Sequence, residues 1–113
     1  MNLEAKKRLR DIAEACAAAG RFTAGKTFSD YEADEILRAA VERKLAIIGE
    51  AFNQLEAADA SVTQTFPELR KIVGMRNRIV HGYDNVDEEL VWDVVQNRLP
   101  ALQQKAETIL QTA

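Results

Sequence analysis

The chain has 113 residues, enough for one hydrophobic core and too few for two, so we expect a single domain over residues 1–113. Its formal net charge of −3 argues against a strongly basic protein that coats nucleic acid, although a local basic site remains compatible with it. With one cysteine and one histidine, one chain forms neither an internal disulfide nor a multi-histidine or thiolate metal site. We therefore expect no metal and no cofactor.

The sequence shows no targeting or membrane-spanning pattern, so we expect a cytoplasmic protein. The first residues include lysines but no apolar core of a signal peptide. No apolar run approaches the roughly 18 residues that a membrane span needs. With two prolines and five glycines, the composition favours helices throughout. Cys16 lies among alanines, where we expect a buried thiol rather than a nucleophile.

The first two predicted helices span residues 3–19 and 30–58. An apolar stripe with the spacing of a helix defines the first, and Gly20 is expected to end it. Ser29 and Glu32 have the spacing of a capping box, which predicts that the second helix begins there and continues without a break.

Two charged residues of the second predicted helix need an explanation. Lys44 lies inside the apolar stripe, so its ammonium group should extend outward to solvent or meet an acid. Glu50 lies between two small residues and is either an exposed helix charge, an ion-pair partner of Arg76, or part of a dimer contact.

The rest of the chain predicts two or three more helices. Residues 59–65 read as a polar loop, and Thr65 is the expected N-cap of a third helix that ends at Gly82. Asp87 is expected to cap a fourth helix, and Pro100 to interrupt the chain before the last one. Helices with short connections predict an all-α, antiparallel four- to five-helix bundle.

The third predicted helix carries the most unusual stretch of the chain. At about 100° per residue, one apolar stripe consists of Leu69, Ile72, Val73, Ile79 and Val80. Arg76 falls at the centre of that stripe, where its permanent charge requires an anionic partner, a cleft or a subunit boundary. Asn77 and His81 lie one turn apart on the flank of the stripe, and Arg78 points to the other side.

The same stretch forms a local basic cluster. Arg70, Lys71, Arg76 and Arg78 fall within nine residues that contain no acid. We expect Arg70, Lys71 and Arg78 to contact the phosphates of a bound RNA.

The motif Arg76-Asn77-x-x-x-His81-x-Tyr83 resembles the Arg-x4-His-x-Tyr signature of HepT toxins in the HEPN superfamily. The resemblance extends from the long second helix to Leu99-Pro100. It implies an HEPN-like helical bundle, a homodimer with paired motifs near its interface, and a toxin that is an endoribonuclease. It also implies a cognate antitoxin, an MntA-type nucleotidyltransferase that transfers AMP to tyrosine.

The chemistry of the motif suits RNA cleavage without a metal. His81 can move a proton near neutral pH, Arg76 can stabilise charge on phosphate oxygens, and Asn77 can orient either group. His81 and Arg76 lie about 140° apart around an ideal helix, so one chain need not direct both at one phosphate. In a homodimer, Arg76 of one chain would complement His81 of the other.

Each motif residue also has an explanation without catalysis. His81 could cap the end of its helix, and Arg76 could form a structural ion pair in a non-catalytic helical dimer that binds a partner through the same face. Tyr83 is either a half-buried ring at the end of the helix or, by the resemblance, the site of AMP transfer.

Overall fold

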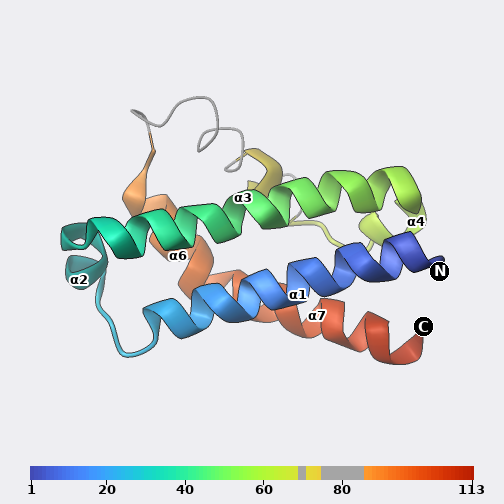
Figure 1. Ribbon diagram of the computed structural model, residues 1–113, viewed down its shortest axis with the longest axis horizontal. Coiled ribbons are helices and arrows are strands. Elements are labelled where there is room, and N and C mark those ends of the chain that lie inside the picture. Colours follow the sequence, from blue (N-terminus) through green and yellow to red (C-terminus); the bar gives the residue numbers. More distant parts are fainter. Residues whose placement is uncertain (69–70, 75–85) are drawn as a thin grey trace.

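The computed structural model describes residues 1–68, 71–74 and 86–113, and over these residues the fold is all-α, without a strand (Figure 1). The named helices are α1 (Leu3–Thr23), α2 (Phe28–Ala33), α3 (Glu35–Ala58), α4 (Ala60–Thr63), α6 (Glu88–Asn97) and α7 (Leu99–Thr112). Residues 71–74 are also helical. The predicted all-α helical bundle is confirmed.

Helix α1 packs against α3 on one side and α7 on the other, and it runs antiparallel to both (Figure 1). Leu9 and Ile12 of α1 and Leu45 and Ile48 of α3 are completely buried in the core between them. Burial of each such side chain contributes about 1.5–3 kcal/mol, so this α1–α3 contact is the main apolar core of the bundle.

Helix α1 ends later than predicted, because Gly20 does not stop it. The helix continues to Thr23, whose hydroxyl donates to the carbonyl of Ala19 at 3.0 Å. The Gln96 side chain of α6 in turn donates to the Thr23 hydroxyl at 3.1 Å. The chain then turns at Gly25, where φ is +73°. The end of α1 thus contacts α6.

The predicted helix over residues 30–58 is in fact two helices, α2 and α3, which are separated at Asp34. Asp34 has an extended backbone (φ −111°, ψ 99°), and its carboxylate accepts a hydrogen bond from the amide of Leu37 at 3.0 Å. A short polar side chain that caps the following backbone competes with helix continuation. No break occurs near Lys44, and α3 is the longest of the described helices.

The predicted capping box of Ser29 and Glu32 is wrong by two residues. Thr27 and Asp30 form it instead: the Thr27 hydroxyl accepts from the Asp30 amide at 3.1 Å, and the Asp30 carboxylate accepts from the Thr27 amide at 2.9 Å. These hydrogen bonds lower the pKa of Asp30. With this start, Tyr31 lies completely buried on the inner side of α2.

The segment predicted as a loop at 59–65 contains the short helix α4. The Thr65 hydroxyl donates to the carbonyl of Val62 at 2.7 Å, so it serves the end of α4. The described helical hydrogen bonds of the next segment begin at the carbonyl of Glu68, which accepts from Lys71 and Ile72. The prediction of Thr65 as the N-cap therefore placed the helix start too early.

The two carboxyl-terminal helices follow the predicted pattern. The Asp87 carboxylate caps α6 by accepting from the amide of Leu90 at 3.1 Å, and Pro100 lies in the first turn of α7. The apolar faces of both helices are buried in the core, through Val91, Val94, Val95, Leu102 and Ala106. The amino and carboxyl termini lie at the same end of the bundle (Figure 1).

Candidate functional site

The predicted catalytic residues Arg76, Asn77 and His81 lie outside the described residues. The same holds for the remaining motif and basic residues, Arg70, Arg78 and Tyr83. Their roles stay predictions, and the described residues that flank this segment define the surroundings of the site.

The amino-terminal flank of the motif is anchored in the core. Phe66 and Ile72 are buried, and the ring of Phe66 meets that of Phe52 in α3 edge-to-face, with 5.3 Å between the ring centroids. Aromatic pairs with this geometry add about 0.5–1.5 kcal/mol to the stabilisation from burial. The chain therefore enters the motif from a position fixed against α3.

The carboxyl-terminal flank is held by an aromatic cluster. Trp92 of α6 packs against Tyr31 and Phe28 of α2, with centroid distances of 5.4 and 6.3 Å. Together with the Asp87 cap, this cluster fixes the start of α6, where the chain leaves the motif segment. Both ends of residues 75–85 therefore join the rigid bundle.

Two cations near the amino-terminal flank share one carboxylate. The ammonium of Lys71 and the guanidinium of Arg98 lie 3.9 and 3.6 Å from Oε2 of Glu68. These distances are too long for strong hydrogen bonds, and the side chains of Lys71 and Arg98 remain 67% and 43% exposed. Lys71 is thus accessible for the phosphate contact predicted for it.

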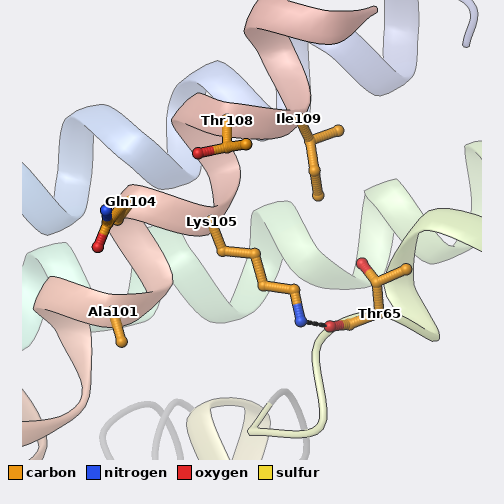
Figure 2. A pocket seen from close by; sticks show the side chains of 6 residues that line it. All are labelled: Thr65, Ala101, Gln104, Lys105, Thr108 and Ile109. Carbon is orange, nitrogen blue, oxygen red and sulfur yellow. Dashed lines mark hydrogen bonds between the residues drawn. The ribbon is translucent and has the colours of Figure 1, made fainter.

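Lys105 of α7 reaches the same region from the other side. Its ammonium donates to the carbonyl of Thr65 (Figure 2). The same ammonium lies over the ring of Phe66, 5.3 Å from the centroid. Sequence reasoning missed both Arg98 and Lys105, because neither belongs to the motif and no spacing pattern connects them with residue 68.

A second polar cluster lies beside the carboxyl-terminal flank. Burial, and then the charge of Glu88, raise the pKa values of both the Tyr31 hydroxyl and the Glu42 carboxyl. The Tyr31 hydroxyl and Oε2 of Glu88 are buried and form no hydrogen bond of ordinary geometry with the described residues. Arg38 partly offsets the negative charge. The sequence analysis did not identify this cluster.

The structure places three further residues that the sequence singled out. Glu50 is exposed on α3, as expected for a simple helix charge, while its possible partner Arg76 lies outside the described residues. Cys16 is buried, as predicted, and this burial raises the pKa of its thiol to about 12, which disfavours the thiolate. Lys44 is half-buried and lines a surface hollow of about 490 Å³ together with Asp11 and Glu14 of α1.

Within residues 1–68, 71–74 and 86–113, no three His, Cys, Asp or Glu side chains form a cluster that could hold a metal ion. Among the helices in these ranges, none is long and apolar enough to cross a membrane.

Comparison with known proteins points to one family. A family model described as ribonuclease HepT-like matches residues 12–109. A protein of Thermococcus cleftensis named "Probable ribonuclease HepT" is 34% identical over 106 residues, which are 92% of this chain and 94% of that protein. A protein of Caldanaerobacter subterraneus named "Putative RNase" is 30% identical over 103 residues, or 91% of each chain. A Methanocaldococcus jannaschii protein, also named "Putative RNase", is 29% identical over 108 residues, covering 94% of this chain and 96% of that one. No solved structure gives a significant match.

Proposed function

Because this chain belongs to the ribonuclease HepT-like family, we propose that it is an endoribonuclease and the toxin of a toxin–antitoxin pair. The observation that carries this proposal is the family match over residues 12–109, which includes the whole Arg76-to-Tyr83 motif. The motif residues supply a proton carrier and a permanent cation, the two groups that RNA cleavage needs.

In the proposed reaction the ribose 2′-hydroxyl attacks the adjacent phosphorus. His81 removes the hydroxyl proton while the new O–P bond forms, and Arg76 stabilises the negative charge on the phosphate oxygens. The bond from phosphorus to the 5′-oxygen then breaks, and that oxygen leaves as a hydroxyl after it takes up a proton from solvent, while His81 releases its proton to solvent. The products are a 2′,3′-cyclic phosphate and a 5′-hydroxyl. Asn77 orients the imidazole or the phosphate, and no step requires a metal.

The proposed active unit is a homodimer. Arg76 at the centre of an apolar stripe suits a subunit boundary, where a charge can face a cleft instead of the core. The anchored flanks of the motif support this proposal, because a composite cleft requires each chain to hold its segment at a fixed place on the bundle.

Regulation is proposed to act through Tyr83. An MntA-type nucleotidyltransferase antitoxin would transfer AMP to its hydroxyl, and each AMP would bring a phosphodiester charge to the Arg76 and His81 site. The bound nucleotides would occupy the electropositive cleft that RNA needs.

The test of the proposed activity compares RNA cleavage by the wild-type protein with that by Arg76→Ala and His81→Ala. We expect each variant to lose cleavage by a factor of at least about 100, the usual effect of a lost acid–base group or charge stabiliser. Arg10→Ala, on the exposed side of α1, is the matched control and should cleave normally. Cleavage should persist in EDTA and yield cyclic phosphate ends.

Two outcomes would contradict the proposal. Equal activity of the wild-type protein and both alanine variants would favour the non-catalytic dimer that binds a partner. Activity that disappears on chelation and returns with magnesium would contradict the metal-independent mechanism. Regulation is tested separately: incubation with ATP, magnesium and the antitoxin should add AMP to the wild-type protein and none to Tyr83→Phe.

A further inference from the structure

A surface hollow lies on α7, near the segment that leads into the motif. It lies between α7 and the chain around Thr65, has a volume of about 530 Å³, and is lined by Thr65, Ala101, Gln104, Lys105, Thr108 and Ile109 (Figure 2). This volume falls within the range of about 300–1,000 Å³ that is typical of small-molecule sites.

The lining combines the two kinds of surface that an unpaired nucleobase uses. Ala101 and Ile109 provide apolar area for the flat face of a base. Gln104 and Thr108 carry donors and acceptors that can meet the polar edge of the same base.

The charges around this hollow are predominantly positive. Lys105 lines the hollow itself. Lys71 and Arg98 lie by Glu68, three residues along the chain from the lining residue Thr65. The one acidic residue of α7, Glu107, accepts a hydrogen bond from the Gln103 side chain. Its charge also raises the pKa of the buried Cys16 thiol in α1, which places Glu107 toward the other side of the helix.

The cations are also available to a ligand. Exposed ion pairs contribute about 0–1 kcal/mol, and the contacts of Lys71 and Arg98 with Glu68 are long. A phosphate group can therefore compete with Glu68 for these two side chains. Because the cations come from separate elements, this arrangement suits a ligand that carries several phosphates, such as RNA.

The position of the hollow relates it to the proposed cleavage site. Lys71 precedes Arg76 by five residues, so their Cα atoms are at most about 18 Å apart, whatever the conformation between them. That distance corresponds to a few nucleotides of an extended RNA strand.

From these observations we infer that the hollow is a second RNA subsite, which binds one unpaired base on the apolar surface of Ala101 and Ile109 and its flanking phosphates on Lys105, Arg98 and Lys71. This inference rests on the proposed function and extends it: the substrate is single-stranded RNA that continues beyond the scissile phosphate by a few nucleotides. The subsite favours longer substrates over the shortest ones.

The experiment measures binding of single-stranded RNA of three and of eight nucleotides to His81→Ala protein, which should bind RNA without cutting it. Adding Lys105→Gln and Arg98→Gln should weaken binding of the eight-nucleotide RNA by about tenfold. It should also reduce the slope of log affinity against log salt by about 1.4, from two lost phosphate contacts at about 0.7 each. Affinity for the three-nucleotide RNA should not change. The matched control, Arg10→Gln with Lys26→Gln, removes the same charge from α1 and the α1–α2 turn and should leave the preference for longer RNA intact.

A second variant tests the base pocket without changing any charge. Ala101→Trp fills the hollow from α7, where Ala101 is exposed and a larger side chain should not disturb the core. It should abolish the advantage of an eight-nucleotide RNA over the same RNA with abasic sites beyond the third nucleotide. Thermal unfolding of each variant shows whether the fold is retained.

The outcomes separate this inference from the proposed function. If the wild-type protein cleaves RNA while the double and Ala101→Trp variants bind the longer RNA unchanged, the subsite is overturned and the nuclease stands. If the control pair has the same effect as the test pair, the subsite is also overturned. If the double variant loses binding to the antitoxin but not to RNA, the hollow is a protein-docking surface instead. If the wild-type protein neither binds nor cleaves RNA, both proposals fail.

Discussion

The Glu42 carboxyl lies in surroundings that disfavour its charge, through partial burial and the neighbouring Glu88 carboxylate. Its pKa is therefore higher in the folded than in the unfolded protein, and the folded state holds the proton more tightly. As the pH rises from about 4.5, the usual pKa of glutamate, through the raised folded pKa, the contribution of Glu42 to the free energy of unfolding falls. Tyr31, whose pKa is also raised, stays protonated throughout this range.

Glu42→Gln tests this linkage, because glutamine resembles the protonated side chain. We expect the variant to be more stable than the wild-type protein near pH 7 and about equally stable below pH 4.5. Urea unfolding at a series of pH values measures the difference. Glu56→Gln, at an exposed position of the same helix, should show no such pH-dependent gain. A constant offset between wild-type and Glu42→Gln curves at every pH would contradict the raised pKa.

Cys16 should be protected from alkylation for two reasons, its burial and its raised thiol pKa of about 12. At pH 8 only about one thiol in ten thousand would be ionised at that pKa, against roughly a quarter for an ordinary cysteine. We expect iodoacetamide to label the folded protein at least about a thousandfold more slowly than the protein in concentrated urea. Mass spectrometry after timed quenching measures both rates, and rapid labelling without denaturant would show that the α1 core opens readily.

At the level of the helices, two capping side chains mark the starts of α2 and α3: Thr27 and Asp34. Thr27→Ala and Asp34→Ala each remove a capping side chain and should each lower the free energy of unfolding by about 0.5–2 kcal/mol. Ser29→Ala is the matched control, since Ser29 is exposed and does not cap α2 in the structure. Chemical denaturation of the three variants gives the comparison. A loss in Ser29→Ala equal to that in Thr27→Ala would support the start that the sequence suggested.

These caps show why sequence reasoning located helices better than their ends. Both Thr27–Asp30 and Ser29–Glu32 have the spacing of a capping box, and local sequence does not choose between them. With the N-cap at Thr27, Tyr31 is buried against Trp92. Trp92 belongs to α6 and lies sixty-one residues after Tyr31 in the sequence. Asp87 was predicted correctly, because two glutamates and a clear apolar stripe directly follow it.

At the level of the whole molecule, apolar periodicity was enough to predict the bundle, since each helix must bury one face and short connections place neighbours antiparallel. The motif was likewise readable, because its residues are close in sequence. Two further cations were not, because Arg98 is thirty residues from Glu68 and Lys105 is forty residues from Thr65, and only the packing of α7 brings these pairs together. Sequence patterns thus predict what is local, and tertiary packing assembles the rest of the site.

The proposed composite cleft makes a prediction about mixtures of inactive variants. If Arg76 of one chain acts with His81 of the other, a heterodimer of Arg76→Ala and His81→Ala contains one cleft with both residues intact and one with neither. Random exchange of subunits makes half of the dimers heterodimers, so the mixture should regain about a quarter of wild-type activity. If each chain uses its own pair, every cleft in the mixture lacks one residue and activity should not return.

The measurement mixes the two purified variants, allows subunits to exchange, and follows RNA cleavage over time. Light scattering before and after mixing establishes that dimers are present at the working concentration. Mixing each variant with the doubly substituted chain is the control, because neither of those heterodimers contains an intact cleft. Recovery in the first mixture alone would support the dimeric site. Full RNA cleavage by wild-type protein that light scattering shows to be monomeric would contradict it. Cleavage that fails to recover, although exchange is complete, would place Arg76 and His81 in one chain.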